Sequence, residues 1–152
     1  MKIALVFLNN NASHPPMGLA YIASYLLRDI NDISIRIIDG CFNDVTKELL
    51  NDDFDLIGIS AMTIEYGDAL KLARQIKNEK NVPIIIGGVH ISTLPISFKN
   101  CFDLGVVGEG EQTFTEVIKS FVKYKKLNYT DLIKIDGLVF YKDDNIYLTQ
   151  IR

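Results

Sequence analysis

Two short stretches contain the side chains best suited to chemistry. One is IIIGGVHISTLP, residues 84–95, in which His90 follows a pair of glycines, and the other is GEGE, residues 108–111. His90 could bond to backbone at a strand end or contact a ligand, and both readings stay open; metal ligation is less favoured because only His14 could join it as a second imidazole. Glu109 and Glu111 could form an acid/base pair. Because a glycine separates them, we favour one capping the next helix or binding ligand hydroxyls and the other being solvated.

No complete catalytic set accompanies these stretches. The chain has no Ser/His/Asp order, and its two cysteines, Cys41 and Cys101, belong to no C-x-x-C or Cys/His pattern. We therefore predict neither catalytic residues nor metal ligands in this chain. Both cysteines are interpreted as small, partly buried hydrophobes in a reducing compartment. The sequence indicates a protein that holds a ligand and does not transform it alone.

Length and charge exclude several classes of protein. A chain of 152 residues is most simply one domain, and a net charge of -3 argues against nucleic-acid binding. The basic cluster at residues 119–126 has the spacing of a solvated helix face. The amino terminus, MKIALVFLNNN, resembles a first strand more than a signal peptide, and no run of ~18 apolar residues could span a bilayer. We expect a cytoplasmic protein without membrane or nucleic-acid partners.

The elements that must position these stretches follow an alternating pattern. Short β-branched runs fall at residues 2–8, 34–39, 56–60, 83–88 and 104–108, and helical patterns fall at 18–29, 45–51, 66–78 and 113–126, with a short element near 95–99. Near-continuous apolarity predicts parallel strands covered on both faces. We predict an α/β, doubly wound, flavodoxin-like (Rossmann-like) fold with a five-stranded parallel sheet in the order 2-1-3-4-5. Residues 137–150 predict a C-terminal β-hairpin with a four-residue turn, 142–145.

Polar loops follow four of these strands. In an open α/β sheet, ligands bind beyond the carboxyl ends of the strands, so the loops at 9–18, 60–65, 87–93 and 108–113 should converge on one edge. Glycines there let backbone approach a bulky ligand, and Ser60, Thr63, Ser92 and Thr93 offer small donors. Turns after parallel strands are rich in Gly, Ser and Thr for backbone reasons alone. Four such loops on one rim nevertheless favour a binding edge.

The loops resemble the amino-terminal cobalamin (B12)-binding domain of B12-dependent radical SAM proteins. The matching stretches are PPMGLAYIASYL (15–26), IIDG (37–40), DLIGISAMT (55–63), DALKLARQIK (68–77), PIIIGGVHIS (83–92), VVGEGEQTF (106–114) and IDGLVFYKDDNI (135–146). Their order and spacing match over nearly the whole chain. The pair GGxH and GEGE, about twenty residues apart, is the most specific part.

The resemblance implies a corrinoid lying across the carboxyl edge, with its nucleotide tail in the cleft beside the sheet and its macrocycle against the loop at 9–18. Ser60 and Thr63 would meet the phosphate of the tail or nearby amides, and Gly108, Glu109 and Gly110 would close its far side. The residues expected to bind the cofactor are Pro16, Gly18, Ser60, Ala61, Thr63, Gly87, Gly88, His90, Val107, Gly108, Glu109 and Gly110.

Two departures from related patterns refine this expectation. The chain lacks the D-x-H-x-x-G signature by which methionine-synthase-like domains supply a lower cobalt ligand, so we predict a cobalt without His90 as ligand. It also lacks the C-x-x-x-C-x-x-C that holds a [4Fe-4S] cluster and S-adenosylmethionine. Residues 1–152 would then be a single B12-binding-like domain, with an α/β core at 1–128 and a hairpin at 135–150 leading to a missing radical SAM domain. Either it is an excised domain or it is a stand-alone carrier.

The predicted function is a cobalamin-binding module that positions a corrinoid for methyl transfer or another radical reaction of a C-terminal radical SAM domain. Metal binding, through the cofactor, and a transferase role follow from the resemblance. The alternative is a regulatory domain of the same architecture that binds no cobalamin and docks a catalytic domain through the hairpin and residues 121–129. A phosphorelay receiver is disfavoured because Ser60 stands where that fold needs an aspartate.

Overall fold

The structure is a computed structural model that describes residues 1–8 and 15–152. Its strands are β1 (Lys2–Phe7), β2 (Ser34–Asp39), β3 (Leu56–Ser60), β4 (Ile84–Gly87), β5 (Leu104–Val106), β6 (Leu138–Lys142) and β7 (Asn145–Leu148). The helices are α1 (Met17–Asp29), α2 (Val45–Asn51), α3 (Tyr66–Glu79), α4 (Val89–Thr93), α5 (Gly110–Tyr124) and α6 (Tyr129–Leu132), with a 3-10 turn, η1, at Pro95–Ser97.

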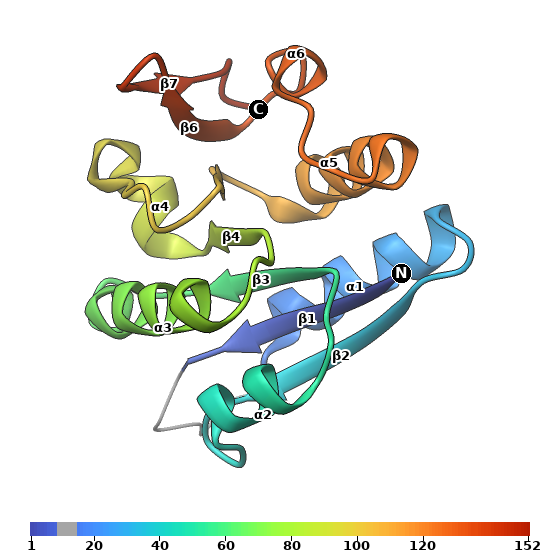
Figure 1. The fold of residues 1–152 in the computed structure, drawn as a ribbon. Coiled ribbons are helices and arrows are strands. Elements are labelled where there is room, and N and C mark those ends of the chain that lie inside the picture. The colour runs from blue at the N-terminus through green and yellow to red at the C-terminus, as the bar shows by residue number, and fades with distance from the viewer. Residues whose placement is uncertain (9–14) are drawn as a thin grey trace.

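The described strands form one sheet in the order β2-β1-β3-β4-β5-β6-β7, which runs from the lower part of Figure 1 to its top. Strands β1 to β5 are parallel, so the predicted doubly wound fold and its order 2-1-3-4-5 are confirmed. The predicted hairpin is present and extends the same sheet, because β6 pairs antiparallel with β5. The sheet therefore has seven strands, of which the first five are parallel.

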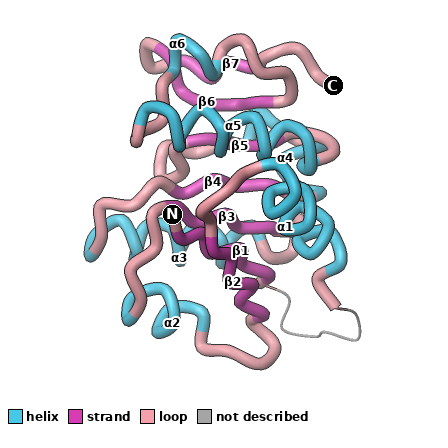
Figure 2. Tube along the Cα trace, turned by 90° about the vertical axis from the view of Figure 1, so that its right-hand side faces the viewer, coloured by secondary structure: helices cyan, strands magenta, loops and turns pink. Residues whose placement is uncertain are grey.

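Helices cover both faces of the sheet, as Figure 2 shows. Side chains alternate along each strand, so Ala4 and Val6 of β1 pack on the side of α2, α3 and α4, while Ile3 and Leu5 pack on the side of α1, α5 and α6. All four are essentially fully buried. Full burial of a Leu or Ile side chain contributes about 1.5–3 kcal/mol, so these two layers fix the strands whose ends form the edge discussed below.

Two local predictions were wrong and one was confirmed. Residues 89–93 form the helix α4 and not a loop, because Gly88, at φ 95°, turns the chain from strand directly into helix. The predicted four-residue turn is confirmed, because Lys142 pairs with Asn145 and the two central residues, Asp143 and Asp144, both have positive φ, as expected for the tight turns that match strand twist. Cys41 is exposed and not partly buried, whereas Cys101 is half-buried.

Candidate functional site

The carboxyl ends of the parallel strands align in one row. Phe7 of β1 pairs with Asp39 of β2 on one side and with Ser60 of β3 on the other, and Ser60 pairs with Gly87 of β4. The residues that follow these strand ends therefore share one edge of the sheet. Backbone hydrogen bonds join the neighbouring loops, since the N–H of Ala61 donates to the carbonyl of Gly87 (3.1 Å) and the N–H of His90 donates to that of Ala61 (3.3 Å).

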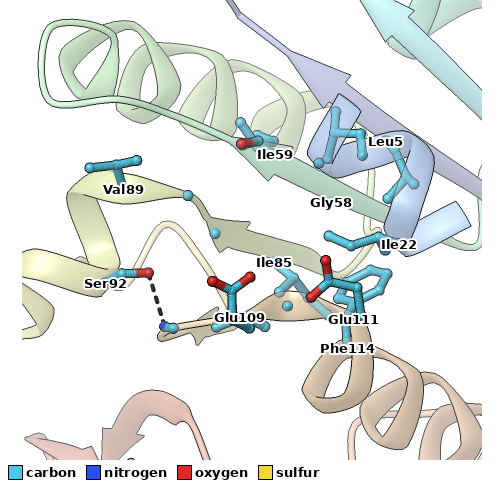
Figure 3. A pocket seen from close by; sticks show the side chains of 18 of the residues that line it. Leu5, Ile22, Gly58, Ile59, Ile85, Val89, Ser92, Glu109, Glu111 and Phe114 are labelled. Carbon is cyan, nitrogen blue, oxygen red and sulfur yellow. Dashed lines mark hydrogen bonds between the residues drawn. The ribbon is translucent and has the colours of Figure 1, made fainter. Parts of the chain in front are cut away.

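A cavity of about 440 Å³ opens at this edge, between the sheet and the beginnings of α1 and α5 (Figure 3). Its volume falls in the range of ~300–1,000 Å³ that is typical of small-molecule sites. Its lining comes from segments far apart in the chain, namely Leu5, Gly18, Leu19, Ile22, Gly58, Ile59, Ser60, Ile85, Gly87, Gly88, Val89, Ser92, Thr93, Val106, Gly108, Glu109, Gly110, Glu111 and Phe114.

The wall formed by the sheet and its helices is apolar. Leu5, Ile85 and Val106 come from three strands, Ile22 comes from α1, and Phe114 comes from α5. The ring of Phe114 approaches β3 closely because Gly58 has no side chain, and a Cβ there would meet Phe114 Cζ at 3.3 Å. This wall offers dispersion contacts but no polar side chain.

The polar side chains of the cavity lie toward its mouth. The carboxylates of Glu109 and Glu111 point into it, and the hydroxyl oxygen of Ser92 accepts a hydrogen bond from the N–H of Gly108 at 3.0 Å (Figure 3). Glu109 occupies the N-cap position of α5, but its side chain makes no capping hydrogen bond. Because helix starts leave N–H groups without intrahelical partners, the first turn of α5 adds donors beside these carboxylate acceptors. No Lys, Arg or His belongs to the described lining.

Glycines keep the mouth open. A Cβ built at Gly18 or Gly108 would meet no atom within 4 Å, and Gly108 also has a φ of 85°, which disfavours other residues. Gly88 has a different role, since a Cβ there would lie 2.7 Å from the carbonyl oxygen of Ala61. Gly88 thus allows the β4–α4 turn to press against the β3–α3 loop.

His90 lies beside the cavity but does not line it. Its Nε2 is 2.9 Å from Ser97 Oγ, its Nδ1 is 3.3 Å from Thr63 Oγ1, and its ring stacks on Tyr66 with centroids 3.9 Å apart. Ser97 Oγ donates its only proton to the carbonyl of Leu94 (2.7 Å), so a neutral His90 donates from Nε2 and accepts at Nδ1.

Tyr66 completes this arrangement under His90. Burial raises the pKa of Tyr66 above its ordinary value, so its hydroxyl stays protonated and donates to the carbonyl of Ser97 at 2.8 Å. Both ring nitrogens of His90 therefore have partners, and its side chain is buried. The imidazole ties the β3–α3 loop to α4 and η1.

The residues proposed from sequence divide into two groups. Those that line the cavity are Gly18, Ser60, Gly87, Gly88, Gly108, Glu109 and Gly110. Those that do not are Pro16, Ala61, Thr63, His90 and Val107. Ala61 and Val107 have buried side chains and contribute backbone hydrogen bonds between segments, as in the bond from the N–H of Val107 to the carbonyl of Gly137. The part of the 9–18 loop from 9 to 14, including His14, lies outside the described residues.

Sequence reasoning missed the apolar wall. Leu5, Ile22, Ile85 and Phe114 line the cavity, yet each belongs to a run that also builds the core, so composition did not distinguish them. A sequence signal for the wall did exist. Side chains alternate between the two faces of the sheet along β1 and β4, and those nearest the polar edge on one face are candidates for the wall. Glu111, considered only in the acid/base pair, also lines the cavity.

The described residues also bear on metal binding and membrane insertion. Within residues 1–8 and 15–152, no group of three or more His, Cys, Asp or Glu residues is placed to hold a metal ion. None of the helices that the structure describes has both the length and the apolarity to span a membrane.

The cavity of about 440 Å³ lies at the carboxyl edge of the parallel strands, which is where open α/β sheets bind their ligands. Fold and site thus define a cofactor-binding module on a doubly wound sheet. A sequence profile described as the B12 binding domain matches residues 4–118, and the chain belongs to this family.

Curated relatives are longer than this chain. An uncharacterised methyltransferase of Pyrococcus horikoshii is 38% identical over 122 residues, which are 74% of this chain and 26% of the relative. The bacteriochlorophyllide d C-8(2)-methyltransferase of Chlorobaculum tepidum is 31% identical over 84 residues, 55% of this chain and 18% of that enzyme. The chain therefore spans about a quarter or less of the length of these relatives.

Solved structures share the fold across nearly all of the chain. The radical S-adenosylmethionine methyltransferase TsrM from Kitasatospora setae superposes with a TM-score of 0.80 at 18% identity, covering 98% of this chain and 30% of that one. The cobalamin-dependent S-adenosylmethionine radical enzyme OxsB superposes with a TM-score of 0.69 at 20% identity, covering 99% and 22%. At these identities the likeness establishes the fold.

Proposed function

We propose that the chain binds cobalamin, with the nucleotide tail in the cavity and the macrocycle over the carboxyl edge. The observation that supports this most is the cavity itself, because separate loops of a B12 binding domain border one hollow of about 440 Å³ that opens at that edge. When bound, the cofactor supplies a cobalt centre for methyl transfer or other radical chemistry. The chain supplies binding and orientation.

Each polar group of the mouth has a complementary partner in such a ligand. The hydroxyl of Ser60 can donate to the phosphate of the tail. The carboxylates of Glu109 and Glu111 can accept hydrogen bonds from ribose hydroxyls or corrin amides, but they disfavour a phosphate placed beside them. We therefore place the phosphate nearer Ser60 than the two glutamates.

The cobalt is proposed to bind without His90. Both nitrogens of its imidazole already hydrogen-bond within the protein, and the ring is packed on Tyr66. Coordination to cobalt would break one of these hydrogen bonds. The hydroxyl of Ser97 or of Thr63 would then lose its partner on the imidazole. In this proposal His90 acts as a positioning residue that fixes the β4–α4 turn, and not as a ligand.

We further propose that the chain acts as one domain of a longer cytoplasmic radical SAM methyltransferase, followed by a C-terminal domain that holds S-adenosylmethionine and a [4Fe-4S] cluster. The greater length of the relatives supports this, as do the methyltransferase names they carry. Ile64, Val89 and Ile96 are strongly exposed on segments that follow β3 and β4. Such apolar exposure suits contact with the cofactor or with a second domain.

The test is reconstitution with hydroxocobalamin. Purified protein incubated with the cofactor and then desalted should retain a visible corrin spectrum in about equimolar amount. Protein that leaves the column without colour would contradict cobalamin binding. A radical SAM enzyme is tested separately, by whether the gene continues past Arg152 into a three-cysteine loop.

A docking module that binds no corrinoid is the second candidate. All four residues of the edge strand β7 are exposed, with Ile146 and Leu148 on one face of the sheet and Tyr147 on the other. An unpaired edge of this kind can accept another strand or domain. This candidate predicts association with a C-terminal catalytic domain while a titration with hydroxocobalamin shows no binding.

A further inference from the structure

The chemical character of the cavity wall bears on which corrinoids can bind. Corrinoids share one macrocycle but differ in the lower base at the end of the nucleotide tail, which can be a benzimidazole, a purine or a phenol. The base is the most distal part of that tail. If the tail enters the cavity from the carboxyl edge, the base is the part that meets the apolar wall.

We infer that this site selects corrinoids with an apolar lower base, of the benzimidazole or phenol type, over those with a purine. The inference rests on the proposed function. The wall that would surround the base is built from Leu5, Ile22, Ile85, Val106 and Phe114, none of which can donate or accept a hydrogen bond. Phe114 adds an aromatic face for stacking.

An adenine base would lose hydrogen bonds at this wall. It carries three free ring nitrogens and an amino group, whereas dimethylbenzimidazole carries one free ring nitrogen and a phenol carries none. The carboxylate of Glu111, near Ile22 in Figure 3, could accept from the amino group. It is an acceptor only, so the ring nitrogens of adenine would still lack donors.

The expected preference can be bounded from the number of unmatched groups. Each buried acceptor without a donor weakens binding by about tenfold, since it loses its bond to water and gains none. With two more such acceptors than dimethylbenzimidazole, adeninylcobamide should bind about tenfold to a hundredfold more weakly than cobalamin. A phenolyl cobamide has one unmatched acceptor fewer than cobalamin, so it should bind at least as tightly as cobalamin and up to about tenfold more tightly.

The experiment is a spectroscopic titration of the 152-residue chain with four corrinoids. They are cobalamin, p-cresolylcobamide, adeninylcobamide and cobinamide, which has no nucleotide tail. The expected result is that adeninylcobamide binds more weakly than cobalamin and that p-cresolylcobamide binds at least as tightly as cobalamin. Adeninylcobamide binding as tightly as cobalamin would overturn the selectivity and leave the proposed function standing.

Cobinamide tests whether the nucleotide tail uses the cavity, and a matched pair of variants tests whether the apolar wall causes the selectivity. Cobinamide binding as tightly as cobalamin would show that the tail does not use the cavity, and no binding of any corrinoid would refute the proposed function itself. Val106→Thr adds a donor to the wall at nearly constant volume and should reduce the preference against adeninylcobamide by about two- to tenfold. Val139→Thr, at a buried strand position that does not line the cavity, should leave the preference unchanged.

Discussion

Replacement by alanine should destabilise the protein at Gly88 and have little effect at Gly87, the adjacent glycine of the GGVH motif. Gly88 has a φ of 95° and a ψ of -176°, a conformation open essentially to glycine alone. A Cβ at this position would also lie 2.7 Å from the carbonyl oxygen and 2.8 Å from the nitrogen of Ala61. Both obstacles are backbone atoms, so a rotamer change cannot relieve them.

Gly88→Ala should therefore destabilise the fold. Residues held in such sparsely populated backbone regions cost about 1–3 kcal/mol, and the clash with Ala61 adds to this. In a chain of this size 1 kcal/mol shifts Tm by about 2–4 °C, so the predicted fall is about 2–12 °C or more. The β4–α4 turn should move as well, since it can no longer press against the β3–α3 loop.

Gly87→Ala is the matched control. Gly87 has no positive φ, and its Cβ would meet only Val106 Cβ, at an ordinary 4.0 Å. Gly→Ala in a strand changes stability by less than about 1 kcal/mol in either direction. Thermal unfolding followed by circular dichroism compares the two variants. Equal Tm values, or a Gly88→Ala protein as stable as the parent, would refute the roles assigned to these glycines.

Two other predictions concern His90 and the Lys2–Asp52 pair. The EPR spectrum of the Co(II) form should be the same in the parent and in His90→Ala, because the imidazole binds Ser97 and Thr63 and not cobalt; nitrogen splitting that disappears in the variant would contradict this. A hydrogen bond from Lys2 Nζ (2.6 Å) lowers the pKa of Asp52 below its ordinary value. The pair therefore stabilises the folded state above about pH 4, and this stabilisation is lost as the pH falls through the lowered pKa. The free energy of urea unfolding of Lys2→Met should thus differ from that of the parent more at pH 7 than at pH 2, and an equal difference at both pH values would be inconsistent with this role of the pair.

Strand order was predictable because its physical cause lies in short, local patterns. The run LIGIS of β3 and the run IIIG of β4 are too apolar for a strand with one exposed face. The amphipathic pattern of α3 lies between them in the sequence, as in a strand–helix–strand crossover, so parallel strands were the expected arrangement. Helix α4 was missed because it has five residues, fewer than a periodic pattern needs. Its start depends on the φ of Gly88, which the sequence suggests but does not determine.

The site was predictable at its polar rim and not at its wall. Ser60, Gly87 and Glu109 follow strand ends, and the rule for open α/β sheets brings strand ends together. Ile85 and Phe114 belong to the same apolar runs as the core, and only three-dimensional packing decides which of them faces a cavity. His90 illustrates the opposite case, since its position beside the edge suggested ligand contact while its hydrogen bonds show a structural tie.

The most direct test blocks the cavity without harming the fold. Gly18 and Gly67 are both the second residue of a helix, α1 and α3, and a Cβ at either would meet nothing within 4 Å, but only Gly18 lines the cavity. Hydroxocobalamin should bind the parent and Gly67→Phe with the same Kd, and Gly18→Phe at least about tenfold more weakly. Unchanged binding by Gly18→Phe, or no binding by the parent, would contradict a cobalamin tail in this cavity.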